Sequence, residues 1–273
     1  MSRPRAGPGR DVSSLRRQFD VQGAAIADWL EVLPEAAWPA PSALPGWTVT
    51  ELSMHTAQVA QALTDALAAG PVGTVGARGS VALDIAAYTA AWVNHAEEIA
   101  DRSREAARGL DPAAVLRQHA ADRAALAAAL DATPGDPVIA ARRGPIRLSA
   151  MLVTRVSELV VHATDLSRSV PSVPPVPLAA EAVATSCRML AEILVARAPG
   201  RSVELRVPPH VAVQCVAGPQ HTRGTPGAVV QTDPLTWIAL ATGRAAWSGA
   251  LAAGRLSASG LRADLSGYLP VLA

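Results

Sequence analysis

Apolar residues recur three or four positions apart through most of the first 169 residues, which is the spacing of helices with one buried face. The helix starts are marked as well. Thr48 is followed three residues later by Glu51, which completes a capping box. A short turn-rich stretch over 133–147 is expected to form a hairpin around Gly144. The helices predicted in this half span 11–34, 48–69, 81–108, 112–131 and 149–169.

The pattern changes after residues 170–177, which read VPSVPPVP. Four prolines in eight residues cannot continue a helix, so a stiff, extended connector and a domain boundary are expected here. Beyond it lies one more helix over 178–198, followed by short alternating runs that are typical of strands. The strands are expected at 203–207, 211–216, 228–231 and 256–259, and further helices at 233–241, 247–252 and 261–269. The fold class is thus a helical domain over 11–169 followed by a small α+β domain over 178–273.

Composition narrows the class of protein. Half of the 273 residues are hydrophobic, so a core can form, and the 24 basic residues (all arginine) nearly balance the 23 acidic ones. A net charge of +1 provides no strong field for nucleic acid or an anionic membrane. No apolar run approaches the ~18 residues of a membrane span, and no secretory signal begins the chain, so a cytoplasmic location is expected. Cys187 and Cys215 are interpreted as buried free thiols.

The candidate chemistry lies in a largely apolar helix that contains Glu158 and His162. Residues four apart share one helix face, and a buried carboxylate and imidazole need partners. The pair alone also fits an exposed Glu–His pair. His55, in the middle of the second helix, favours a metal site, because two histidines and one carboxylate form a three-ligand set that leaves room for water or substrate. Zinc is the default ion, and nickel, iron and manganese are also compatible.

Neighbouring residues suggest supporting roles. Asp165, three residues beyond His162, is a candidate to orient that ligand, or else is a surface residue near a helix end. Arg155 shares the face of Glu158 and is a candidate either to pair with it or to reach an anionic ligand. His95 and His119 fall on charged helix faces and are expected to be solvated.

Two motifs then carry a family resemblance. The run LPGWTVTELSMH, ending at His55, and the run RVSELVVHATDL, from Arg155 to Leu166, resemble the two motifs of the mycothiol-dependent maleylpyruvate isomerase family. The resemblance covers 11–169 and implies a DinB-like metal-binding four-helix bundle. It also implies that His55, Glu158 and His162 hold a divalent metal, usually zinc, which activates the thiol of mycothiol, a small thiol of actinobacteria.

The C-terminal half resembles a bacterial sterol-carrier-protein-like domain. The resemblance rests on the runs HTRGTPG (221–227), TDPLTW (232–237), ATGR (241–244) and GRLSASG (254–260). It implies helices packed on a curved sheet that can enclose an apolar cavity. Three roles stay open for this domain: a lid over the metal site, a dimerisation surface in a homodimer, or a carrier of an apolar ligand. Arg223 lies in its Gly/Pro-rich loop and is a candidate to hold a carboxylate near the metal cleft.

Two functions follow from these patterns. The first is a metal-dependent, mycothiol-dependent isomerase or thiol transferase that acts on a small electrophilic substrate, with Arg155, Asp165 and Arg223 as orienting residues. The second is a non-catalytic protein that binds an apolar, lipid- or sterol-like ligand and uses the metal only for structure. A regulator that senses a thiol or a metal ranks last, because the charge pattern does not favour DNA binding.

Overall fold

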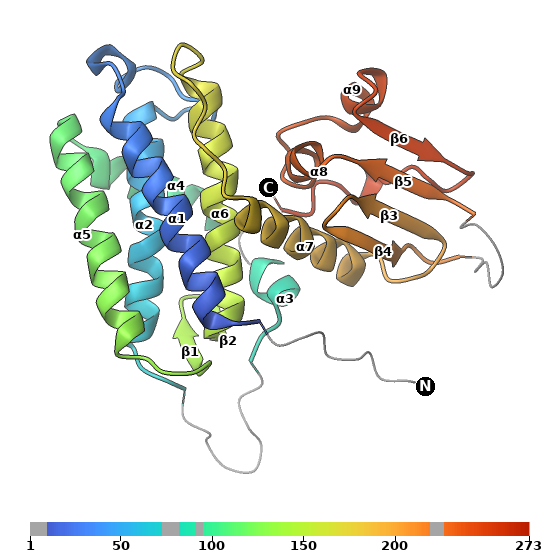
Figure 1. Cartoon of the computed structure of the whole chain (residues 1–273), viewed down its shortest axis with the longest axis horizontal. Coiled ribbons are helices and arrows are strands. Elements are labelled where there is room, and N and C mark those ends of the chain that lie inside the picture. Colours follow the sequence, from blue (N-terminus) through green and yellow to red (C-terminus); the bar gives the residue numbers. More distant parts are fainter. Residues whose placement is uncertain (1–9, 73–81, 91–94, 219–226, 273) are drawn as a thin grey trace.

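A computed structural model of the chain describes residues 10–72, 82–90, 95–218 and 227–272. Four long helices form a bundle (Figure 1): α1 (Val12–Glu31), α2 (Val49–Ala68), α5 (Pro112–Asp131) and α6 (Leu148–Ser169). Both α1 and α2 pack against α5 and α6. Helix α6 is buried along most of its length, which places its polar residues inside the molecule. The predicted four-helix bundle is confirmed.

Local side-chain hydrogen bonds define where these helices begin. At α2, the Thr48 hydroxyl accepts from the Glu51 amide at 3.2 Å, and the Glu51 carboxylate accepts from the Thr48 amide at 2.7 Å. This is the capping box that the sequence predicts. At α5, Asp111 accepts from the amide of Ala114, and Pro112 occupies the first helical position, where its missing N–H costs nothing. The start of α2 is therefore fixed two turns before His55.

The single helix predicted over 81–108 is wrong. The structure instead has α3 (Ile85–Ala90) and α4 (Ala96–Ala107), with Asp84 accepting from the amide of Ala87 at the start of α3. Helix α3 packs against α6 and α7, whereas α4 packs against α2, and one straight helix could not reach both surfaces. The hairpin expected near Gly144 is present as β1 (Val138–Ala141) and β2 (Gly144–Arg147).

The proline-rich connector is held firmly against the first helix. Trp29 donates its indole N–H to the carbonyl of Pro174 at 2.7 Å. The fully buried Gln22 donates to the carbonyl of Pro177 at 3.1 Å and accepts from the amide of Ala179 at 3.0 Å. Helix α7 (Ala180–Arg197) then packs against α6 and α1, and it links the bundle to the sheet (Figure 1).

The C-terminal half contains a four-stranded sheet in the order β4-β3-β5-β6. Its strands lie close to the predicted positions: β3 (Val203–Val207), β4 (Val211–Cys215), β5 (Val229–Thr232) and β6 (Leu256–Ser259). The β3–β5 pair is parallel and the other pairs are antiparallel. Alternate residues of β3 are buried, whereas Glu204 and Arg206 on the other face form a partly exposed ion pair at 2.6 Å.

Two helices, α8 (Pro234–Ala241) and α9 (Trp247–Ala252), complete the α+β part of the fold. Trp237 on α8 is buried and donates to the carbonyl of Cys187 on α7. Burial raises the pKa of the Cys187 thiol to about 12 and that of Cys215 to about 11, as expected of buried thiols.

The last helix predicted from the sequence, over 261–269, is wrong. The structure has a short 3₁₀ turn, η3 (Ser266–Tyr268), in its place. Leu261, Leu265 and Leu269 have helical spacing, but Leu261 is fully exposed while Leu265 is buried, so no continuous helix face packs there. Across the described residues, no helix combines the length and apolar character needed to span a membrane.

Candidate metal centre

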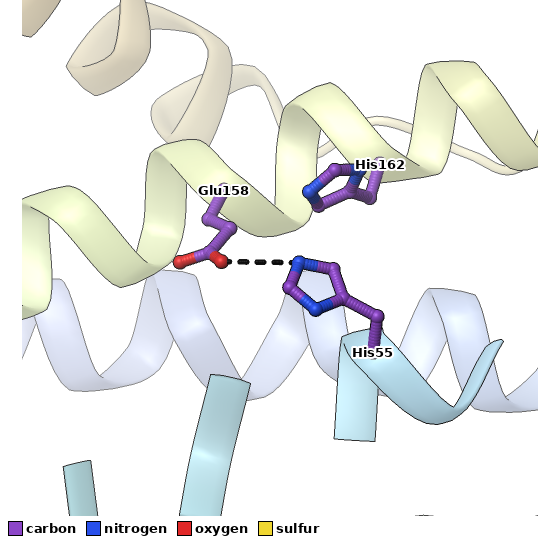
Figure 2. Close-up of side chains that lie close together, drawn as sticks. All are labelled: His55, Glu158 and His162. Atoms are coloured by element: carbon purple, nitrogen blue, oxygen red, sulfur yellow. Dashed lines mark ion pairs between the residues drawn. The ribbon is translucent and has the colours of Figure 1, made fainter. Parts of the chain in front are cut away.

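Three side chains that can bind a metal converge between α2 and α6 (Figure 2). His55 comes from α2, while Glu158 and His162 lie one turn apart on α6. Nε2 of His55 lies 3.3 Å from Oε1 of Glu158, and the two imidazole rings are nearly perpendicular with centroids 4.7 Å apart. One donor atom from each residue lies within 4.8 Å of the other two. The residues singled out in the sequence are thus brought together.

The second ring nitrogen of each histidine already has a partner. Nδ1 of His55 lies 3.3 Å from the hydroxyl of Ser103, a buried residue of α4, and Nδ1 of His162 lies 3.1 Å from Asp165. The tautomer with the proton on Nδ1 satisfies both partners and makes the Nε2 lone pair available to a metal. A metal bound there would replace the hydrogen bond that Nε2 of His55 can otherwise donate to Glu158. Two neutral imidazoles with free Nε2 atoms are what a divalent metal requires.

Charge at the cluster favours an ionised carboxylate beside neutral imidazole. Burial raises the pKa of Glu158, but the charge of Arg155 and the hydrogen bond from His55 outweigh it and bring that pKa to about 2. Burial lowers the pKa of His55, because the charged ring would lose its hydration. At neutral pH the cluster therefore holds a carboxylate and a neutral His55, both in the state that binds metal.

One oxygen of Glu158 faces Arg155. Oε2 lies 2.7 Å from Nη1 of Arg155, so the predicted ion pair is present. That oxygen is buried, yet within the described parts of the chain it accepts no hydrogen bond of acceptable geometry. The guanidinium of Arg155 compensates the charge of this oxygen, while Oε1 faces His55. The donor set of two imidazoles and one carboxylate fits a divalent metal.

Asp165 connects the cluster to the C-terminal half. Its carboxylate is fully buried, so the interpretation as a surface residue is wrong. Besides contacting His162, it accepts two hydrogen bonds from Arg244, at 2.9 Å from Nη2 and 3.3 Å from Nε. Burial raises the pKa of Asp165, but the hydrogen bonds from His162 and Arg244 bring it to about 2. A stable anion therefore orients His162.

The cluster lies at a cavity of about 240 Å³ between the bundle and the C-terminal half. Arg244 and Thr242 contribute polar groups to its wall, and most of the other lining residues are apolar. The apolar lining consists of Leu44, Trp47, Ile99, Ala100, Val161, Met189, Leu190 and Leu272. Because Met189, Leu190 and Leu272 come from beyond the connector, the C-terminal half forms one wall of the cavity.

The remaining residues singled out in the sequence lie away from the metal cluster or outside the described residues. Arg223 lies outside the described residues, as does His221. His95 is partly exposed and pairs with Glu98, as expected. The prediction for His119 is wrong: it is 4% exposed, and its Nε2 lies 2.8 Å from the carbonyl of Ser53 on α2. Charged residues of α5 flank His119 in the sequence, but the His119 side chain points toward the bundle core.

Two residues at the site have no role assigned from the sequence. Arg244 reaches Asp165 across 79 positions of the chain, and Ser103 reaches His55 across 48. An arginine or a serine has no distinctive spacing relative to a partner so far away. The available signal for Arg244 is its position in the run ATGR, one of the runs in which the C-terminal half resembles a bacterial sterol-carrier-protein-like domain.

The fold and the cluster define a helical bundle with a two-histidine, one-glutamate site that is closed on one side by an α+β domain. The family model described as the mycothiol maleylpyruvate isomerase N-terminal domain matches residues 19–167, and the chain belongs to this family. A second model, described as a bacterial SCP ortholog, matches residues 179–271. No protein with a curated description matches the chain.

Solved structures show the same fold over both halves. The crystal structure of a mycothiol-dependent maleylpyruvate isomerase matches with a TM-score of 0.60 at 18% identity, covering 91% of this chain and 93% of that one. A variant of that isomerase with one histidine replaced by alanine matches with a TM-score of 0.59 at 19% identity and the same coverage. At this identity the likeness establishes the arrangement of the chain.

Proposed function

We propose that this protein is a metal-dependent, mycothiol-dependent isomerase or thiol transferase that acts on a small electrophilic substrate. The observation that carries the proposal is the convergence of His55, Glu158 and His162 at the cavity of about 240 Å³. Three protein ligands leave a further position for an exogenous ligand, as in catalytic rather than structural zinc sites. Membership of the maleylpyruvate isomerase family supports the same assignment.

We assign His55 Nε2, the Glu158 carboxylate and His162 Nε2 as the metal ligands, with zinc as the expected ion. When bound, such an ion lowers the pKa of a coordinated thiol, which is then a thiolate at neutral pH. Ser103 and Asp165 hold the two imidazole rings with Nε2 available. Arg244 keeps Asp165 ionised through its hydrogen bonds. Its guanidinium also lines the cavity, where it can orient an anionic group of the substrate.

The thiol has to come from outside the chain. Cys187 and Cys215 are both buried, and neither lines the cavity. Burial keeps both as thiols at neutral pH, since the pKa values are about 12 and 11. An exogenous small thiol such as mycothiol therefore fits the site, and the largely apolar walls limit the access of water to a reactive thiolate. A thiol of this kind is held inside cells, in agreement with the expected cytoplasmic location.

The alternative is a carrier of an apolar ligand, and it has one observation in its favour. The residues that match the bacterial SCP ortholog model contribute Met189 and Leu190 to the apolar wall of the cavity. In that case the ligand would occupy the same cavity and the metal would only fasten α2 to α6. A lipid that co-purifies in native mass spectrometry would favour this function over the enzyme.

The deciding experiment is metal content by elemental mass spectrometry on protein purified without added metal. We expect about one zinc per chain in the wild type and a loss of at least tenfold in His55→Ala and Glu158→Gln. The control is His95→Ala, which removes a partly exposed histidine away from the cluster and should keep its metal. Full metal content in Glu158→Gln would contradict the ligand assignment.

A second readout tests the thiol. In cobalt-substituted protein, mycothiol should add a thiolate-to-cobalt absorption band, which a direct bond between the sulfur and the metal produces. The band should be missing when S-methylated mycothiol is used. If the spectrum of the metal-loaded protein does not respond to mycothiol, metal binding would still be supported, but binding of the thiol to the metal would be contradicted.

A further inference from the structure

A second cavity lies on the other side of the His55–Glu158 pair. It has a volume of about 80 Å³ and shares His55, Ile99 and Glu158 with the first cavity as wall residues. Neither Arg244 nor the apolar residues of α7 line it. It lies instead between α2, α3, α4, α6 and the β1–β2 hairpin, entirely within the N-terminal half. The metal cluster therefore has a distinct neighbouring space on the bundle side.

Four arginines line this second cavity, which we call the arginine pocket. Arg155 of α6 is buried, Arg143 is partly buried, and Arg102 and Arg142 are exposed at the residue level, so the pocket opens to solvent on their side. Among the described residues that line it, Glu158 is the single carboxylate. Arg155 pairs with Glu158, and Arg142 pairs with Glu98.

The arginines crowd one another. Burial lowers the pKa of Arg102, and the charges of Arg142 and Arg143 lower it further, while Glu98 and Asp65 oppose the shift without cancelling it. A lowered arginine pKa means that the protonated, positively charged form is less favourable here than in water. Two of the three charges concerned, Arg142 and Arg143, come from the hairpin turn between β1 and β2. An anion among the guanidinium groups would offset this repulsion.

The remaining lining defines which anion fits. Val59, Ala62 and Met151 present hydrocarbon to the pocket, and Tyr88 adds an aromatic side chain. Planar guanidinium groups bind carboxylates through paired hydrogen bonds, and the apolar part of the lining suits a short carbon chain better than a fully hydrated inorganic ion. The volume of about 80 Å³ favours a small organic acid over a sugar or a nucleotide.

We propose that the arginine pocket is a binding site for a small organic carboxylate, held mainly by Arg102, Arg142 and Arg143 beside the metal cluster. A carboxylate bound there leaves its carbon chain next to His55 and Glu158, which form the shared wall. Binding needs no metal, because the three guanidinium groups come from α4 and the hairpin and not from the metal cluster. The site would stand even if the cluster held no ion.

The test is isothermal titration of chelator-treated, metal-free protein with succinate as the probe. Succinate should bind, and its neutral diamide should not, because the amide groups carry no charge for the arginines to pair with. Arg102→Gln combined with Arg143→Gln should weaken succinate binding at least tenfold. The matched control is Arg17→Gln combined with Arg117→Gln, which removes the same charge from exposed helix positions and should change the affinity less than twofold.

A single variant and two further titrations distinguish the possible results. Arg102→Gln alone changes an exposed residue and should weaken binding severalfold even if the double variant fails to fold, which circular dichroism will show. Succinate that binds only to zinc-loaded protein would place the ligand on the metal and overturn the proposal. Phosphate that binds as tightly as succinate would overturn the carboxylate assignment. Absence of binding, or equal binding by the double variant, would overturn the site itself.

Discussion

Three histidines inside the bundle, His55, His119 and His162, each have a named partner at one ring nitrogen. His55 and His162 use Nδ1 toward Ser103 and Asp165, which leaves Nε2 for a ligand. His119 instead has Nε2 against the carbonyl of Ser53 and 3.3 Å from the hydroxyl of Thr56, and so serves the packing of α5 on α2. The same residue type thus has two uses, and the neighbour of each ring nitrogen decides between them.

His119 predicts a specific loss of stability in acid. Burial lowers its pKa from 6.5 to about 4, so the unfolded chain takes up a proton at a higher pH than the folded one. The stability that depends on neutral His119 is complete above pH 6.5 and is lost as the pH falls toward 4. The loss amounts to about 3 kcal/mol of unfolding free energy, from ~1.4 kcal/mol per pKa unit.

The measurement is urea unfolding at several pH values for wild type and His119→Gln. The glutamine still donates to the Ser53 carbonyl but does not titrate, so the variant should lose about 3 kcal/mol less between pH 6.5 and 4. Contributions from His55 cancel in this difference. His95→Gln, which changes a partly exposed ring, serves as the control and should follow the wild type. Equal slopes for His119→Gln and wild type would contradict the assignment.

At the scale of elements, α2 is the helix on which the site depends most. It carries His55, and it packs against α4, α5 and α6. Its first turn is stabilised by the reciprocal bonds of Thr48 and Glu51 rather than by burial of those two residues. The rotation of α2 about its axis, which directs His55 toward α6, follows from packing of its apolar face, while the cap defines where the helix begins.

Thr48→Ala should lower the unfolding free energy by about 1 kcal/mol, because the amide of Glu51 loses its side-chain acceptor. Thr64→Ala on the same helix is the control. The Thr64 hydroxyl bonds back to the carbonyl of Ala60 in mid-helix, so alanine there should be neutral or slightly stabilising. Metal content at saturating zinc should be unchanged in both variants. Denaturant unfolding measures the difference, and equal stability of the two variants would refute the role of the cap.

For the whole molecule, polar contacts at Gln22 and at Asp165 help to join the bundle to the chain beyond it. Gln22 fastens the proline-rich connector, and Arg244 of the C-terminal half pairs with Asp165 of α6. Apolar packing of α7 on α6 and α1 accompanies both. These contacts hold the two halves in one relative position. The cavity wall that the C-terminal half provides therefore keeps its place beside the metal cluster.

Gln22→Ala should lower the unfolding free energy by about 2 kcal/mol, since the carbonyl of Pro177 and the amide of Ala179 would both lose the partly buried hydrogen bonds that the buried Gln22 provides. Gln61→Ala, which changes an exposed glutamine of α2, should stay within about 0.5 kcal/mol of the wild type. Calorimetry should also show one unfolding transition for the wild type, given the coupling of the halves. Two separate transitions in the wild type would contradict that coupling.

Much of the architecture is determined by the sequence itself. Helical and alternating periodicities, together with Thr48, Asp111 and the proline run, locate the four bundle helices and the four strands. The Glu158–His162 spacing places two candidate ligands on one face, and the family motifs add His55. These signals can be read directly because they depend on contacts between residues close in the chain, where the backbone geometry is known in advance.

Only the tertiary structure decided the remainder. The sequence did not distinguish buried His119 from solvated His95, and the leucines over 261–269 have helical spacing without forming a helix. Arg244 beside Asp165 and the convergence of Arg102 with the hairpin arginines depend on how distant segments pack. Such contacts join elements whose relative position is set by the whole core, because packing energy is shared among many residues and leaves no periodic mark at any one of them.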